Sequence, residues 1–325
     1  MKTPLPNTLA YAEHASEIVA KGAACIAASE RFALITSLAI EGGAARAVGS
    51  LALVDQTGLM TGYLSNGCID RDIQLHAMDA LQTGQKKLIR YGDGSRYADL
   101  KLPCGGALTV LIDPAPDHAA ITAAHGGFLA RKPISMDFQG TDETGATLAR
   151  RFTYAPQTRL VLAGRGAIFR SVAQIAHATG YDLRLLSPEA EDLAAIGHLA
   201  SADPVHLTTP DGPAPLDGID AYCAFLTLFH DHDWEPSLLK AALDTSAGFI
   251  GSLGSQRTHA MRCATLADMG IDERALKRLR GPIGLVPSLR DASSIAVSTL
   301  AEIVAAFPEA VEMQPDNTIA TATVD

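Results

Sequence analysis

The stretch Arg159-Leu160-Val161-Leu162-Ala163-Gly164-Arg165-Gly166 decides the fold of the second half of the chain, because a short apolar run leads directly into a glycine turn. Residues 167–179 continue with helical periodicity and stop before Gly180, and strands and helices alternate further up to Met269. Such alternation predicts a parallel sheet with helices on both faces, since parallel strands need crossover connections. Ligands of these sheets bind beyond the carboxyl ends of the strands.

The first half has a different pattern, in which short apolar strands alternate with glycine-rich turns. We therefore predict an α/β protein with an α+β domain over residues 1–156, a Rossmann-like domain over 157–307 and a flexible tail over 308–325. The expected elements of the first domain are strands at 32–39, 50–55, 59–64, 87–91, 108–112, 133–138 and 147–154, with helices at 69–81 and 117–130. Those of the second are strands at 159–163, 182–186, 205–207, 221–226 and 249–250, with helices at 167–179, within 189–199, at 234–243 and at 255–269.

Composition excludes several classes of protein. The formal net charge is -10 and the basic residues are scattered, which argues against nucleic-acid binding. Five cysteines without a C-x-x-C pair argue against a disulfide framework and a closed zinc site. No apolar stretch approaches the roughly 18 residues of a membrane span. These features predict a soluble protein of the reducing cytoplasm.

Two cysteines border glycine turns and are the candidates for chemistry. Cys68 follows Ser65-Asn66-Gly67 and precedes a predicted helix, whose N-terminal N–H groups and dipole favour a thiolate. Cys104 precedes Gly105-Gly106, where the missing side chains let a ligand approach the main chain. Either cysteine has an alternative as a small turn residue with no role. The other three stand in helical or apolar patterns and are expected to be buried: Cys25, Cys223 and Cys263.

The turn Gly164-Arg165-Gly166 is similar to a dinucleotide-binding turn. Its two glycines predict that a phosphate can approach a helix N-terminus there, with Arg165 as an additional charged donor. Ordinary NAD binding is disfavoured, because Phe169 stands where a third glycine is needed and Ser187-Pro188-Glu189 gives no acid directly after the second strand. A turn without any ligand is the alternative.

Two further segments follow strands of the second domain. His230-Asp231-His232-Asp233 is too short a run to direct all four side chains at one metal ion, so we expect a polar loop in which His230 or Asp233 contacts a ligand. Gly251-Ser252-Leu253-Gly254-Ser255 leads into a helix with Ser255 as N-cap. This turn fits an anion site and is equally explained by capping alone.

Taken together, these segments resemble the XdhC/CoxI family of accessory proteins, which handle molybdenum cofactor for enzymes of the xanthine dehydrogenase type. The resemblance covers nearly the whole chain. Its motifs are GAARAVGS at residues 43–50, SNGCID at 65–70, PCGG at 103–106, FHDHD at 229–233, IGSLGSQR at 250–257, GPIGL at 281–285 and IAVSTLAEI at 295–303. Any one of them is a weak signal, whereas their shared order is a specific one.

The resemblance implies a carrier without catalytic residues of its own. It would bind molybdenum cofactor, as molybdopterin or its dinucleotide form, between the two domains. A partner cysteine desulfurase would install a terminal sulfur, and the carrier would then release its cargo to an apo xanthine dehydrogenase or aldehyde oxidoreductase. The resemblance also implies a homodimer.

The chemistry of the cargo suggests which residues contact it. Molybdenum in this cofactor carries a dithiolene and terminal oxo or sulfido ligands, so the soft thiolates of Cys68 and Cys104 are candidate molybdenum contacts. The other expected cofactor-binding residues are Gly67, Gly105, Gly164, Arg165, Gly166, His230, Asp233, Gly251, Gly254 and Ser255. Two alternatives are a nicotinamide-dependent oxidoreductase with the same fold, and a scaffold for the partner enzymes that needs neither cysteine.

Overall fold

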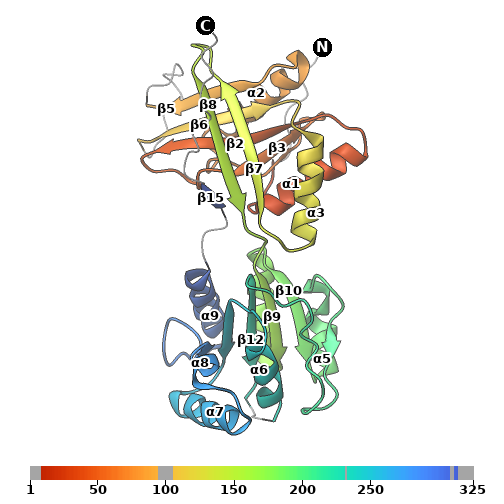
Figure 1. Cartoon of the computed structure of the whole chain (residues 1–325), viewed down its shortest axis with the longest axis vertical. Coiled ribbons are helices and arrows are strands. Elements are labelled where there is room, and N and C mark those ends of the chain that lie inside the picture. Colours follow the sequence, from red (N-terminus) through yellow and green to blue (C-terminus); the bar gives the residue numbers. More distant parts are fainter. Residues whose placement is uncertain (1–8, 94–104, 231–232, 308–310, 314–325) are drawn as a thin grey trace. The chain divides into compact units, whose positions relative to one another are not determined.

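The computed structural model describes residues 9–93, 105–230, 233–307 and 311–313. The chain divides into two compact units (Figure 1). The first comprises Met1–Pro156 together with Glu309–Asp325, and the second comprises Gln157–Pro308. Within the described residues, no helix is both long enough and apolar enough to cross a membrane.

The first unit is built on a six-stranded sheet in the order β1-β4-β3-β2-β6-β5. Its pairs are antiparallel except for β1 with β4. Leu34 and Leu38 of β2 point into one core, and Ala33 and Ile35 point into another, because successive strand side chains face opposite ways. The strands are β1 (Leu9–Ala10), β2 (Phe32–Glu41), β3 (Leu51–Asp55), β4 (Met60–Thr61), β5 (Lys87–Gly92) and β6 (Ala107–Asp113).

Helices cover both faces of this sheet. The helix α2 (Asp70–Thr83) packs on the face that carries Ile35, and α1 (Ala15–Ala27) lies beside α3 (His118–Leu129) on the other face (Figure 1). The strands β7 (Ile134–Thr141), β8 (Thr147–Tyr154) and β15 (Val311–Met313) form a separate antiparallel sheet in the order β15-β8-β7. The expected α+β architecture is confirmed.

Two expectations for the first unit were not met, and the helix α1 was not among the expected elements. The strand expected at 59–64 is only β4, because Gly62 has a φ of +83° and a side chain there would meet the Leu51 carbonyl oxygen. The expected flexible tail contains a strand, β15, and this expectation was wrong for Val311–Met313. Val311 packs against Phe152 beside Gly49, so the segment has an apolar partner distant in sequence.

The second unit has a parallel sheet in the order β11-β10-β9-β12-β13-β14, which is the doubly wound Rossmann order. The Rossmann-like expectation is confirmed. Its strands are β9 (Arg159–Gly164), β10 (Asp182–Ser187), β11 (Val205–His206), β12 (Cys223–Leu228), β13 (Phe249–Ser252) and β14 (Leu279–Arg280). The helices are α4 (Gly166–Ala178), α5 (Ala190–Ile196) followed by a 3-10 turn (Gly197–Leu199), α6 (Glu235–Leu243), α7 (Gln256–Asp268), α8 (Glu273–Leu276) and α9 (Ala292–Ala306).

Helices flank this sheet on both sides, as the alternating sequence pattern requires. One core packs α4 and α9 against β9, and the other packs α6 and α7 against β12 and β13. Phe169 is fully buried in the first core, so the position expected for a third glycine holds a large aromatic ring instead.

Candidate functional site

The turn before α2 is organised around one carboxylate. Oδ1 of Asp70 accepts hydrogen bonds from the backbone N–H groups of Leu64 (2.8 Å) and Ser65 (3.0 Å). Oδ2 accepts from the Ser65 hydroxyl (2.7 Å) and from the Gly67 N–H (3.0 Å). Asp70 is 5% exposed, so these bonds are shielded from water and fix the path of the chain that carries Cys68.

Cys68 is exposed on this turn and lies two residues before the first residue of α2. Gly67 beside it has a φ of +89°, a left-handed conformation that favours glycine. The first turn of α2 carries two carboxylates, Asp70 and Asp72, which offset the positive end of the helix dipole. The positive end of this helix dipole is therefore partly compensated by carboxylates of its own first turn.

Cys104 lies outside the described residues, whereas the glycines that follow it are described. A side chain at Gly106 would lie 2.5 Å from the Glu41 carbonyl oxygen and 2.6 Å from that of Gly43. Gly106 is thus required by close contact between backbones at the start of β6. Gly105 is exposed and has a φ of +68°, with open space around it.

The two glycine turns of the first unit are linked through one tyrosine. The Tyr91 hydroxyl, near the end of β5, donates to Oδ2 of Asp72 in α2 at 2.8 Å. Gly92, next in the chain, abuts Gly106, since a side chain on it would strike the Gly106 carbonyl oxygen. Tyr91 also shares a core with Ile69 beside Cys68, so the two turns are coupled through the interior of this unit.

The turn after β9 holds an internal carboxylate where a phosphate was expected. The Gly166 N–H, at the start of α4, donates to Oδ2 of Asp192 at 2.7 Å, and Oδ1 of the same carboxylate pairs with Arg170. Asp192 is 3% exposed and belongs to α5. Arg165 forms an ion pair with Glu189, with Nη1 and Oε1 at 3.1 Å. An anion entering here would meet two carboxylates.

Gly164 and Gly166 in this turn are explained by two different structural features. A side chain at Gly164 would lie 2.8 Å from the Leu228 carbonyl oxygen, so this residue lets β9 approach β12. Gly166 has a φ of +77° and open space around its Cα. The strand β10 ends at the buried Ser187, and no acid directly follows it.

The remaining predicted residues lie at the carboxyl ends of β12 and β13. His230 and Asp233 are exposed in the loop after β12, and Asp231 and His232 lie outside the described residues. Gly254 has a φ of +146°, and the Ser255 hydroxyl caps α7 by accepting from the Thr258 N–H at 3.1 Å. The expected capping role of Ser255 is confirmed.

Beneath this edge lies a buried ion pair that the sequence analysis missed. Arg262 of α7 donates to the Glu235 carboxylate through Nε (3.1 Å) and Nη2 (2.9 Å), and Nη2 also donates to the Leu253 carbonyl oxygen (2.8 Å). Ser252 donates its hydroxyl to Glu235 at 2.9 Å, and the Thr227 hydroxyl bonds with Ser252. Arg262 and Leu266 are the buried residues of α7, and the sequence of this polar helix does not mark Arg262 as buried.

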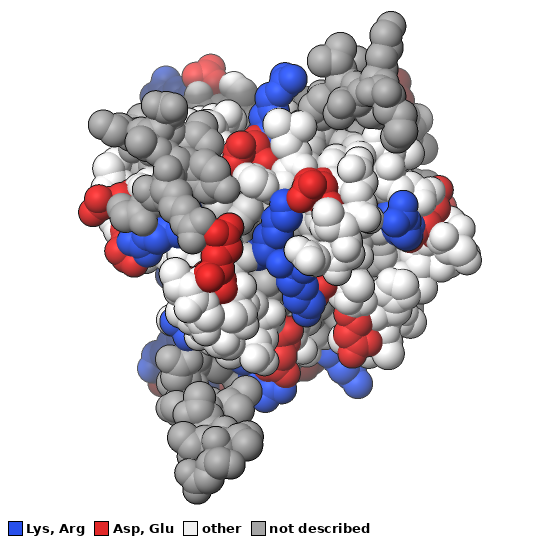
Figure 2. Space-filling model, turned by 90° about the horizontal axis from the view of Figure 1, so that it is seen from above, with Lys and Arg blue, Asp and Glu red and all other residues white. Residues whose placement is uncertain are grey.

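Charged side chains elsewhere are intermixed. On the face shown in Figure 2, the described Lys and Arg residues are interspersed with Asp and Glu. That surface does not offer the clustered positive charge that phosphate backbones select.

Comparison with known proteins agrees with this architecture. A model of the XdhC Rossmann domain matches residues 160–303, and a model of the XdhC and CoxI family matches residues 25–92. The chain belongs to the XdhC and CoxI family. The second match contains Cys68 and Asp70, and the first contains both the Gly164–Gly166 turn and the Gly251–Ser255 segment.

Individual relatives of this XdhC and CoxI chain were found in Escherichia coli (strain K12). The molybdenum cofactor insertion chaperone PaoD is 29% identical over 281 residues, covering 83% of this chain and 81% of PaoD. The uncharacterized protein YqeB is 23% identical over 77% of this chain, which spans 39% of YqeB. A solved structure from Bacillus halodurans, named as a xanthine dehydrogenase, has a TM-score of 0.70 at 19% identity and covers 89% of this chain and 95% of its own. This last likeness concerns the fold.

Proposed function

We propose that this protein binds molybdenum cofactor as cargo and delivers it to an apo molybdenum hydroxylase. The observation that carries the proposal is the likeness to a named molybdenum cofactor insertion chaperone, which extends over both units. The clients that fit the family are enzymes of the xanthine dehydrogenase or aldehyde oxidoreductase type. The protein would act by holding and releasing its cargo, without turning over a substrate.

Cys68 is the proposed contact with molybdenum. Its thiol is exposed, whereas Cys25 and Cys223 are buried, so Cys68 is accessible to a ligand as large as a pterin. A thiolate is a soft donor of the kind that binds metals already carrying sulfur ligands. The Asp70 hydrogen bonds hold the turn in one conformation, which lowers the entropy that binding must overcome. Cys104 remains a proposed second contact.

Of the two glycine-rich segments in the Rossmann unit, Gly251–Ser255 is the proposed seat for the phosphate of the cargo. The Gly166 turn already donates its N–H to Asp192, and Asp192 and Glu189 would repel an anion there. The helix α7 has no acidic residue in its first turn, and Arg262 lies below the segment with its charge shared with Glu235. His230 and Asp233, exposed on the adjacent loop, are proposed as further contacts.

The wider proposal follows from the family. It includes sulfuration of the cargo by a cysteine desulfurase, a homodimer, and action in the cytoplasm. Whether the cargo is molybdopterin or its dinucleotide bears on the Rossmann unit, since the dinucleotide form brings a second phosphate and a base.

The test compares cargo retention with delivery. The protein is purified anaerobically from a molybdate-fed host, and molybdenum and pterin are measured for wild type, Cys68→Ser and Cys263→Ser. We expect Cys68→Ser to lose most of the bound molybdenum, and Cys263→Ser, a half-buried control in the other unit, to retain it. Wild type should raise the activity of an apo molybdenum hydroxylase supplied with cofactor. Equal molybdenum in all three proteins would reject the role of Cys68.

The nicotinamide alternative is favoured by one observation, the Rossmann strand order. It predicts NAD(P)H binding with hydride transfer and no effect on reconstitution of the apo-enzyme. We expect weak or absent NAD(P)H binding, because Phe169 fills the third-glycine position and Ser187 ends the second strand. Tight binding with hydride transfer would overturn the carrier proposal.

A further inference from the structure

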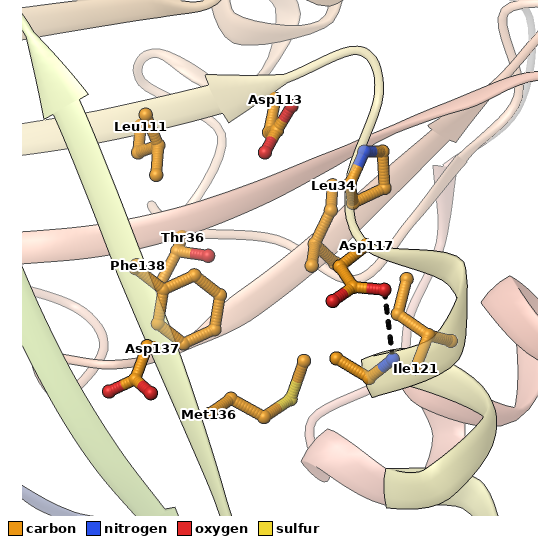
Figure 3. Close-up of a pocket in the computed structure, with 11 residues that line it drawn as sticks. Leu34, Thr36, Leu111, Asp113, Asp117, Ile121, Met136, Asp137 and Phe138 are labelled. Carbon is orange, nitrogen blue, oxygen red and sulfur yellow. Dashed lines mark hydrogen bonds between the residues drawn. The ribbon is translucent and has the colours of Figure 1, made fainter.

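A small pocket in the first unit contains none of the residues proposed to bind the cargo. It is bordered by β2, β6, the N-terminal turn of α3 and β7, and its volume is about 60 Å³ (Figure 3). Most of its wall is apolar and buried, contributed by Leu34, Leu111, Ile121, Met136 and Phe138. Because a water molecule needs about 10–15 Å³ of such cavity space, the pocket has room for a small ligand fragment of a few non-hydrogen atoms.

One polar group in this wall lacks a partner. Thr36 of β2 is 0% exposed, and its hydroxyl forms no hydrogen bond with any described residue. Figure 3 shows the hydroxyl directed toward the pocket. Buried hydroxyls in native proteins nearly always have a partner, so an orphan hydroxyl at a cavity indicates a group that enters the cavity.

The carboxylates that border the pocket determine which charge a ligand in the pocket should carry. Three aspartates border the pocket, and two are neutralised: Asp113 by Lys86 at 2.7 Å, and Asp137 by both Nε and Nη2 of Arg151 at 2.9 Å. Asp117 uses Oδ1 to cap α3 through the Ala119 and Ala120 N–H groups, and among the described residues it has no cationic partner. The Asp117 carboxylate and the Thr36 hydroxyl lie on facing sides of the pocket (Figure 3).

We propose that this pocket binds a primary ammonium group on a short alkyl chain. The N–H groups of the ammonium would donate to the Asp117 carboxylate and the Thr36 hydroxyl, and its first carbons would contact Leu111, Met136 and Phe138. The carboxylate favours a cation, and the apolar wall favours an alkyl chain. A free small amine and the end of a lysine side chain share this chemistry.

The experiment follows backbone amide shifts of the full-length protein during titration with ethylammonium. Three non-hydrogen atoms limit the affinity to a Kd of about 1 mM or weaker. Tetramethylammonium at the same ionic strength lacks N–H donors, and ethanol lacks the charge, so neither should shift residues lining the pocket. Nα-acetyl-lysine N-methylamide tests the second source: stronger binding than ethylammonium assigns the pocket to a lysine side chain, and weaker binding assigns it to a free amine.

Variants separate the two polar contacts. Asp117→Asn keeps an N-capping side chain and removes the charge, so we expect at least fivefold weaker binding with α3 intact. Thr36→Val should weaken binding similarly, and Thr36→Ser, which keeps the hydroxyl, should bind as wild type does. Asp137→Asn is the matched control and should leave the affinity unchanged. Absence of shifts at the pocket, equal response to tetramethylammonium, or unchanged affinity in Asp117→Asn would overturn the proposal.

Discussion

At the scale of single residues, two aspartates satisfy backbone donors of glycine turns for which the sequence had suggested a thiolate (Cys68) and a phosphate (Gly166). Asp70 satisfies the N–H groups of the turn before α2, and Asp192 satisfies the N–H of Gly166. A glycine turn at a helix start has unsatisfied donors, and an internal carboxylate satisfies them as well as a phosphate does. The sequence pattern alone does not separate these two outcomes, because the carboxylate can come from another element, as Asp192 does.

The first prediction concerns Asp70. In Asp70→Asn, one of the two oxygens becomes an amide donor that faces other donors, so two of four hydrogen bonds are lost in a buried site. We expect a loss of about 3 kcal/mol in the free energy of unfolding, measured with urea, since hydrogen bonds to charged groups contribute more than neutral ones. Alkylation of Cys68 by iodoacetamide should change in rate at the same time.

The control for this variant is Asp79→Asn on the same helix. Asp79 is exposed and pairs with Lys87 at the surface, where ion pairs contribute about 0–1 kcal/mol. A loss in Asp70→Asn no larger than that in Asp79→Asn would show that the turn does not depend on the carboxylate.

At the scale of elements, the helix α1 begins with a titratable cap. Nδ1 of His14 accepts the Ser16 N–H at 3.2 Å, and Glu17 completes the capping box through the His14 N–H at 3.0 Å. Burial, together with the charges of Arg46 and Arg131, lowers the pKa of His14 to about 4. A protonated ring cannot accept the hydrogen bond, so the neutral form is the one that caps the helix.

This cap predicts a pH dependence of stability. The folded-state pKa lies below the unfolded value of about 6.5, so the contribution is fully present above pH 6.5 and is lost as the pH falls toward 4. We expect wild type to lose about 2 kcal/mol more than His14→Asn between pH 7 and pH 4, with the partial exposure of the ring allowed for. Asn caps helices without titrating. Parallel curves of urea unfolding free energy for the two proteins would contradict this assignment.

The second prediction at this scale concerns the ion pair that joins α6 to α7. Arg262→Met leaves Glu235, whose side chain is 2% exposed, without its partner, and we expect a loss of about 3–5 kcal/mol. The double variant Glu235→Gln with Arg262→Met removes the uncompensated charge and should recover part of that loss. Chemical unfolding of the four proteins of this cycle measures the coupling. If the loss of unfolding free energy in the double variant equals the sum of the losses in the two single variants, the two residues are not coupled and the prediction is wrong.

Most elements could be predicted from the sequence, because their periodicity is local. The strand at Arg159 and the helix after Gly166 follow directly from an apolar run and a glycine turn. Features that depend on partners distant in sequence could not be predicted. The strand β15 pairs with β8, from which the whole second unit separates it in the sequence, and Glu235 of α6 contacts Arg262 of α7. The position of Cys68 at a helix start was predicted correctly, whereas the carboxylate that shapes its turn was seen only in the structure.

At the scale of the whole molecule, the first unit depends on both ends of the chain. The strand β15 adds to the edge of β8, with Val311 opposite Tyr154, and Val311 covers Phe152. The Tyr154 hydroxyl in turn donates to the Gly49 carbonyl oxygen at 2.8 Å and ties β8 to the turn before β3. Contacts that stabilise the first unit are therefore encoded after the second unit.

This arrangement predicts the effect of a truncation. Ending the chain at Pro308 removes β15 and exposes Phe152. We expect this truncation to lower the free energy of unfolding of the first unit by about 2 kcal/mol, which is the contribution of one buried aliphatic side chain and its strand pairing. Hydrogen exchange followed by mass spectrometry should show faster exchange in β8 and unchanged exchange in β9. Ending the chain at Met313 keeps β15 and is the control. Equal protection of β8 in both truncations would contradict the role of β15.

The pairing of Tyr154 with Val311 also bears on how such a chain can be cut and joined. Tyr154 is the last paired residue before the second unit and Val311 the first after it, and the two face each other in one antiparallel pair. The strands β8 and β15 are therefore the two arms of a hairpin into which a domain is inserted. Hairpin arms are ordinarily joined by two to five residues. A gene in which residues 155–310 are replaced by Asn-Gly therefore joins Tyr154 to Val311 by a two-residue loop and keeps every strand of the first unit. A fragment that simply stops at Pro156 does not, and the natural modules of this protein are nested rather than sequential.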